Sequence, residues 1–219
     1  MSLPFRLDSL ETDRLLALSD GVIAIAITLL VLEITVPEIP PGSTVAILPE
    51  LVAEQWHEFF GYVLSFLTIG LYWVLHRRVF VHIERHDRGV LWLNLVFLLF
   101  VAFIPYATGV FSEYPNTAFG VSFYAVVLAL TGLSLTLLWG YASRKQLIEE
   151  GLASRTVEIQ AIRFLVSPVV FLGSVVIAQF NPTLAIFSWL LLIPLNAVFE
   201  SRLVASIEDS LTESQTRPQ

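Results

Sequence analysis

Six long apolar stretches constrain the fold of this sequence more than any other feature. Each is close to the ~20 residues that an α-helix needs to cross a bilayer core of roughly 30 Å. They cover residues 14–36, 58–76, 90–111, 117–141, 160–180 and 183–203. With 56% apolar and 14% charged residues, the chain has too few polar side chains to cover a water-soluble domain. The sequence therefore predicts an all-α membrane protein with six transmembrane helices.

The basic residues predict the orientation of these helices. All twelve Lys and Arg residues lie in or beside alternate connections, and basic residues near membrane helices are retained in the cytoplasm. We therefore expect a multi-pass protein of the cell membrane with both termini in the cytoplasm. Residues 1–13 would form a cytoplasmic N-terminus, residues 14–203 the transmembrane domain, and residues 204–219 a flexible cytoplasmic tail.

Several classes of function find no support in the sequence. The net charge of −7 gives no electrostatic reason to bind nucleic acid. There is no cysteine, and the four histidines lack the spacing of metal ligands on a buried helix face, apart from the loop pair His82 and His86. Nucleophile-elbow, H-E-x-x-H and phosphate-loop motifs are missing as well. We therefore expect no enzyme activity, no metal site and no cofactor.

The first apolar stretch has two different faces. At 100° per residue, one face carries Gly21, Ile25, Thr28, Leu32 and Thr35, with Leu29 at its edge. The opposite face carries Ile23, Ile27 and Leu30. Small and hydroxylated residues often pack membrane helices together, which is one explanation of the first face. Around a shared axis it would instead form hydrophobic rings beside a hydroxyl ring at Thr28, and such rings can gate a pore by dewetting.

A second polar group, Arg14, Ser19 and Asp20, lies where the first helix enters the membrane. A carboxylate at this depth needs a cation or a hydrogen-bond donor. The six-residue spacing disfavours an Arg14–Asp20 pair, so we expect a partner from another helix. The candidates are His76, Arg77 and Asn94. This group either clamps the first helix in place or contacts permeant ions.

These residues together resemble the transmembrane protein 175 family of potassium channels. Its signature R-x-x-x-F-S-D is matched at Arg14, Ser19 and Asp20, with Leu18 in place of the phenylalanine. The run A-I-A-I-T-L-L-V-L-E, followed by a proline, also looks like the family's first helix. The patterns similar to its second and third helices are Tyr72-Trp73…His76 and Asn94…Phe103-Ile104-Pro105.

The resemblance implies a homotetramer in the bilayer whose first helices line a central pore that conducts or prefers potassium ions. This pore would lack a T-V-G-Y-G selectivity filter. Ile25 would form the narrowest ring, Thr28 the neighbouring hydroxyl layer, and Leu29 and Leu32 further hydrophobic rings. The signature and packing network would comprise Arg14, Ser19, Asp20, Trp73, His76 and Asn94.

Two further expectations concern ion selectivity and the outer mouth. Aliphatic rings cannot replace the water around an ion as carbonyl cages do, so we expect weak to moderate selectivity. Glu33 and Glu38 would concentrate cations at the outer mouth. The alternative function is a secondary transporter or a proton-permeable pathway, although nothing charged lies between Asp20 and Glu33 to relay protons.

Overall fold

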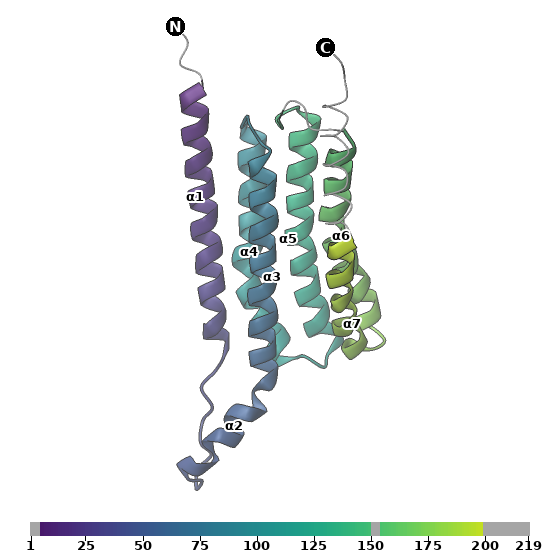
Figure 1. Ribbon diagram of the computed structural model, residues 1–219. Coiled ribbons are helices and arrows are strands. Elements are labelled where there is room, and N and C mark those ends of the chain that lie inside the picture. Colours follow the sequence, from purple (N-terminus) through teal and green to yellow (C-terminus); the bar gives the residue numbers. More distant parts are fainter. Residues whose placement is uncertain (1–4, 150–153, 199–219) are drawn as a thin grey trace.

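The computed structural model describes residues 5–149 and 154–198, which form a bundle of long helices (Figure 1). The long helices are α1 (Phe5–Leu29), α3 (Trp56–Val81), α4 (Arg88–Glu113), α5 (Ala118–Arg144) and α6 (Ser154–Ala178). Within the described residues, five helical segments are long and apolar enough to cross a membrane, the first covering Arg14–Glu33. Their apolar length confirms a multi-pass membrane architecture.

The sixth predicted span lies partly outside the described residues. Its described part begins with α7 (Pro182–Ser188) and a 3₁₀ turn, η3 (Trp189–Leu191), within an apolar helical segment that reaches Val198. This segment is shorter than a full span. Six transmembrane helices therefore remain a prediction, and the predicted tail over 204–219 also lies outside the described residues.

The first apolar span begins at Arg14 as predicted but ends earlier than predicted. The helix that contains it already starts at Phe5, so residues 5–13 are helical as well. This stretch contains no Gly or Pro to stop it. The α-helical geometry ends at Leu29, a 3₁₀ turn, η1 (Leu30–Glu33), follows, and Ile34 is extended. The predicted span to residue 36 is thus too long at its C-terminal end.

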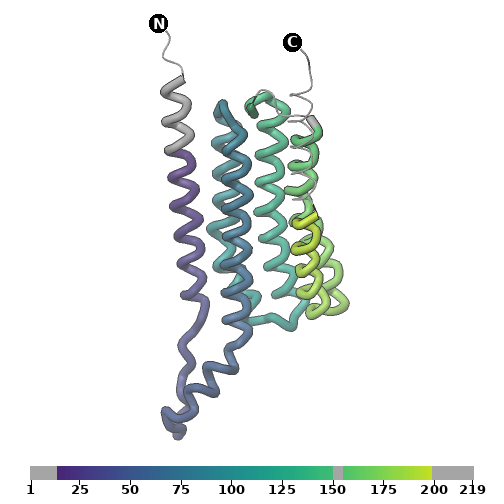
Figure 2. Tube along the Cα trace, viewed as in Figure 1, coloured from purple at the N-terminus to yellow at the C-terminus, as the bar shows by residue number. Residues whose placement is uncertain are grey.

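The bundle has α1 at one edge and α6 near the other. Helix α5 packs against α4 on one side and α6 on the other, while α1 packs against α4 and α3. Figure 2 shows α1 standing apart from α5 and α6. Large aromatic side chains from α4 and α5, among them Phe97, Phe111, Tyr124 and Trp139, are fully buried between the helices. One side of α1 is therefore left without a partner in its own chain.

The two ends of the bundle differ in charge. At one end, hereafter the basic end, residues 82–87 connect α3 to α4, and Arg77, Arg78, Arg85, Arg88, Arg144 and Lys145 gather. There Glu84 N–H donates to Leu147 O at 3.0 Å and Glu149 N–H to His82 O at 2.9 Å, which joins this connection to the residues after α5. The opposite, acidic end carries residues 34–55, with the short helix α2 (Leu48–Glu54) and no Lys or Arg.

Asp87 caps α4 at the basic end. Its Oδ1 accepts a hydrogen bond from Val90 N–H at 2.9 Å, and its Oδ2 accepts one from Tyr141 Oη–H of α5 at 2.6 Å. The Tyr141 bond, with smaller contributions from the backbone and from Lys145, lowers the pKa of Asp87 below its ordinary value. Asp87 thus begins α4 and fixes it to α5.

Acidification is expected to remove the stabilising contribution of Asp87. A carboxylate with a lowered folded-state pKa stabilises fully above its ordinary pKa, 3.8 here, and this contribution is lost as pH falls through the lowered value. In Asp87→Asn the amide keeps a cap acceptor but does not titrate in this range. Thermal unfolding of the detergent-solubilised protein from about pH 6 to about pH 3 should therefore show a shallower pH dependence in the variant. Identical pH profiles would contradict this assignment.

Candidate functional site

The two faces of α1 have opposite environments in the single chain. Ile25, Leu29 and Leu32 are 59%, 41% and 72% exposed, and Gly21 and Thr28 are exposed beside them. On the other face, Ile23 and Leu30 are 2% and 0% exposed because they pack against the bundle. We call the side of α1 and of the η1 turn after it that carries Gly21, Ile25, Thr28, Leu29 and Leu32 the open face. The aliphatic face predicted from the sequence is the one that anchors α1.

Thr28 supplies the polar group in the middle of the open face. Its hydroxyl donates to Ile25 O, three residues earlier, at 2.8 Å. This bond occupies the single hydroxyl proton and leaves the oxygen lone pairs available. The neighbouring Ile25 and Leu29, with Val22 and Ala26 of α1 and Ala102 of α4, line an apolar hollow of about 120 Å³. The open face therefore presents an acceptor oxygen between aliphatic side chains.

Thr35 does not belong to the open face, contrary to the helical-wheel prediction. The helix ends before it, and Thr35 N–H donates to Glu58 Oε2 at 2.7 Å. Gln55 Nε2–H donates to Thr35 O at 2.7 Å. Thr35 thus ties residues 34–55 of the acidic end to the start of α3. A wheel drawn at 100° per residue fails here because the backbone has left α-helical geometry.

A buried hydrogen-bond network holds the other side of α1. Ser19 Oγ–H donates to Leu15 O at 2.9 Å and accepts from Asn94 Nδ2–H of α4 at 3.0 Å. The Asn94 Oδ1 lies 2.8 Å from His76 Nε2 of α3. Since this amide oxygen can only accept, His76 Nε2 carries the proton of the bond. Ser19, Asn94 and His76 are all 0% exposed, so three helices meet through one polar chain.

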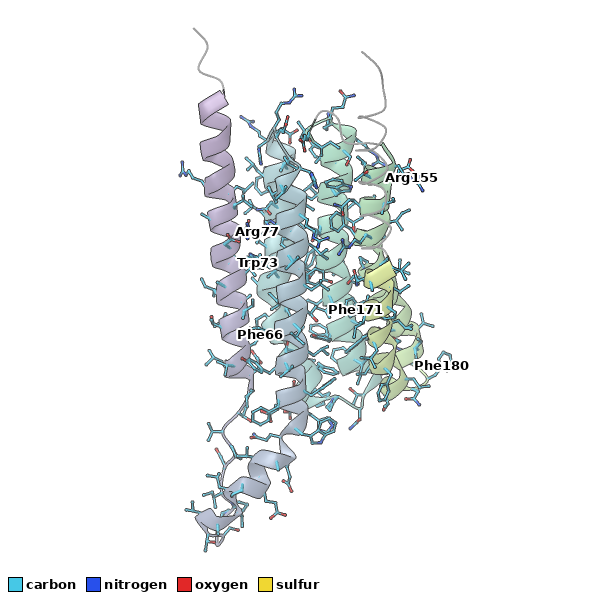
Figure 3. All side chains as sticks on the ribbon, viewed as in Figure 1. Phe66, Trp73, Arg77, Arg155, Phe171 and Phe180 are labelled. Carbon is cyan, nitrogen blue, oxygen red and sulfur yellow. The ribbon has the colours of Figure 1, made fainter. Side chains whose placement is uncertain are left out.

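Asp20 has its partner on another helix, as predicted, but the partner is Trp73. The indole Nε1–H donates to Asp20 Oδ1 at 2.8 Å, and the Arg77 guanidinium lies 5.4 Å from the Trp73 ring centroid. Figure 3 shows Trp73 and Arg77 on the α1 side of α3. The sequence expectation that named His76, Arg77 and Asn94 was wrong because His76 and Asn94 bond to each other and Asn94 to Ser19. Arg14 is exposed.

The two predicted outer-mouth carboxylates lie in different surroundings. Glu33 turns toward α4, where its carboxylate occupies the space that a Cβ atom on Gly109 would need. Glu38 is exposed in the segment beyond η1. Of the two, Glu38 is therefore the carboxylate open to solvent, while Glu33 is half-buried against the bundle.

Two buried hydroxyl clusters were missed by sequence reasoning. Ser65 Oγ lies 2.7 Å from Thr108 Oγ1 and 2.8 Å from Tyr124 Oη. Tyr72 Oη–H donates to Leu128 O at 2.7 Å, and this hydroxyl lies 3.2 Å from Ser167 Oγ. Hydroxyl residues inside apolar spans are the available signal, yet their pairing depends on how the helices are rotated. They bind the helices of the chain to one another. Among the described residues, no group of three or more His, Cys, Asp or Glu side chains is placed to hold a metal ion.

A known family profile matches the part of the chain that carries the open face and the buried hydrogen-bond network. Residues 14–105 match the profile described as endosomal/lysosomal potassium channel TMEM175. A protein of Streptomyces collinus named as a potassium channel is 39% identical over 139 residues, covering 61% of this chain and 66% of the relative. One from a Chryseobacterium species, named likewise, is 32% identical over 158 residues, covering 70% and 78%.

A solved structure agrees with these matches. The crystal structure described as a lysosomal potassium-selective channel TMEM175 homologue from Chamaesiphon minutus superposes with a TM-score of 0.73. It is 27% identical and covers 88% of this chain and 98% of that chain. The profile begins at Arg14 and ends at Pro105, so it includes the open face of α1 and the network of Ser19, Asn94 and His76. From these matches, the chain belongs to the transmembrane protein 175 family.

Proposed function

We propose that the protein is a potassium-permeable cation channel in which the open faces of several chains surround a common axis. Four copies follow from the family resemblance. The observation that carries the proposal is the unpartnered open face, with Ile25 59% and Leu32 72% exposed while Ile23 on the opposite side is 2% exposed. Packing of α1 within its own chain does not account for this face, and symmetric oligomers often use such a surface.

The chemistry of the open face suits a narrow, uncharged pore. Rings of Ile25, Leu29 and Leu32 would exclude water unless the pore widened, which is a hydrophobic gate. The Thr28 oxygen would offer a partial negative charge between these rings. Aliphatic rings do not coordinate an ion, so an ion must keep most of its water. We therefore expect modest preference for potassium, which holds its hydration shell less tightly than sodium.

The difference in charge between the two ends of the bundle would favour entry of cations from the acidic end. With the basic end in the cytoplasm, as the distribution of Lys and Arg favours, the segment containing Glu38, Glu50 and Glu54 faces outward. Such a segment attracts cations to the outer mouth. The Ser19–Asn94–His76 network and the Trp73–Asp20 bond then hold α1 against α3 and α4 at the basic end.

Ion flux through the purified protein in liposomes tests this function against the alternative. A channel should pass potassium down its gradient with no gradient of a second ion. A secondary transporter should require sodium or protons as coupling ion, and a proton pathway should acidify or alkalinise the lumen without potassium. Protein-dependent potassium flux that vanishes without a coupling ion would reject the channel.

Neutralising the outer carboxylates is expected to reduce inward current mainly at low salt. The Debye length is about 30 Å at 0.01 M and about 8 Å at 0.15 M, so the attraction by Glu38 is screened in the second condition. Single-channel or macroscopic currents of Glu38→Gln and Glu33→Gln should be compared at both ionic strengths. The loss should be larger for Glu38, which is exposed, than for Glu33, which faces α4. Unchanged currents at low salt would reject a role of these carboxylates.

A further inference from the structure

A second surface feature lies on the side of the bundle away from α1. It is a groove of about 640 Å³ at the basic end, formed mainly by α5 and α6 with Leu93 of α4. Helix α1 lies at the opposite edge of the bundle (Figures 1 and 2). If the open face of α1 lines the axis, this groove faces the lipid. Permeation therefore does not account for it.

The groove changes from apolar to basic along α5. Leu137 and Gly140 line its deeper part, together with Ala161 of α6, and Arg144 and Lys145 line its outer part. Arg144 lies seven residues beyond Leu137, so the basic part is about 10 Å further along the helix. Both basic side chains are exposed. A phospholipid has the same order, with a phosphate at the interface and acyl chains below it.

Gly140 leaves unfilled space in the apolar part of the groove. A Cβ atom added to Gly140 would meet no heavy atom of a neighbouring residue within 4 Å. Leu137 and Ala161 line the same groove, so the space that the missing side chain leaves is bounded by apolar residues of α5 and α6. This space suits an acyl chain. Arg144 and Lys145 also complement the C-terminal dipole of α5, but that role does not require a groove beneath them.

The charges around the groove favour a lipid with one net negative charge. The lining contains two cations, Arg144 and Lys145, and one carboxylate, Glu158. Asp87, whose charge acts on Lys145, does not line the groove. The net charge of the lining is thus one positive unit. Basic pockets between membrane helices are a known type of site for anionic lipid headgroups.

We propose that this groove binds an anionic phospholipid such as phosphatidylglycerol. The phosphate would lie between Arg144 and Lys145, and one acyl chain would follow Leu137 and Gly140. Exposure of the groove to lipid rests on the proposed arrangement of α1 around the axis, but the site itself uses none of the residues of the open face.

Native mass spectrometry of the full-length, detergent-purified protein tests the site. Phosphatidylglycerol and phosphatidylcholine with identical acyl chains should be titrated separately. Wild type should bind phosphatidylglycerol more tightly, and Arg144→Gln and Lys145→Gln should each weaken that binding about fivefold with little effect on phosphatidylcholine. Arg88→Gln, an exposed charge at the same end, serves as the matched control and should change nothing.

Two further variants separate lipid binding from a general effect of charge or folding. Glu158→Gln removes the carboxylate of the lining and should strengthen phosphatidylglycerol binding, a sign that structural damage would not produce. Gly140→Leu should weaken binding of both lipids, whereas Gly173→Leu, at an exposed position of α6 that also has open space around an added Cβ atom, should not. Equal affinities for the two lipids in wild type, or full displacement of phosphatidylglycerol by inorganic phosphate, would overturn the proposal.

Discussion

Ile25→Asn is expected to raise potassium flux through the protein roughly tenfold or more and to weaken discrimination against sodium. Ile25 lies on the open face, and its aliphatic side chain is 59% exposed in the single chain. An amide in its place would hydrogen-bond water and lower the cost of bringing a hydrated ion through a hydrophobic ring. A barrier lowered by about 1.4 kcal/mol corresponds to the tenfold change. Potassium and sodium flux in liposomes, normalised to reconstituted protein, measure both effects.

Ile23→Asn provides the matched comparison, because it makes the same chemical change two residues away. Ile23 is 2% exposed on the anchored side of α1. There the amide would be buried without a hydrogen-bond partner, which costs about 1–3 kcal/mol of stability. The packing of the isoleucine side chain would be lost as well. We expect a lower yield and thermal stability and no rise in flux. If the two variants raised flux equally, or were equally unstable, the assignment of the open face would be wrong.

The sequence predicts the spans well because an apolar run has to match the thickness of the bilayer. Five predicted spans correspond to helices of the described chain, and the helical wheel separates Ile25 and Thr28 from Ile23 and Leu30 correctly. Both results follow from properties of a single helix, its length and its period. The start of the first apolar span at Arg14 follows from the same count.

Features that depend on contacts between helices were predicted less well. The partner of Asp20 was expected among three polar residues, but the Trp73 indole reaches it. The helix was extended through Thr35, although its 3₁₀ end turns that residue toward Glu58. Glu33 and Glu38 look equivalent in the sequence. In the structure only Glu33 packs against α4, where its carboxylate fills the space beside Gly109. Each of these outcomes depends on the rotation and packing of neighbouring helices, which a single sequence leaves open.

Asn94→Leu is expected to destabilise the bundle by about 1–3 kcal/mol, since it removes both interhelical hydrogen bonds of the network. Asn94 joins Ser19 of α1 to His76 of α3, and all three side chains are 0% exposed. Interhelical bonds in membranes contribute about 0.6 kcal/mol on average and up to about 1.7 kcal/mol each. Unfolding in mixed micelles of a mild and a denaturing detergent measures the loss of unfolding free energy. Asn116→Leu, at an exposed position in the α4–α5 connection, is the control for replacing the same amide.

A double-mutant cycle shows whether the loss comes from the Asn94–Ser19 bond itself. Ser19→Ala alone should cost less than Asn94→Leu, because it removes one of the two bonds and leaves Asn94 paired with His76. The double variant should then be less destabilised than the sum of the single variants, since the bond between the two residues can be lost only once. Strict additivity would mean that Ser19 and Asn94 stabilise the bundle independently. In that case the network does not hold α1 against α4, and the orientation of the open face must depend on the packing of Ile23, Ala26 and Leu30.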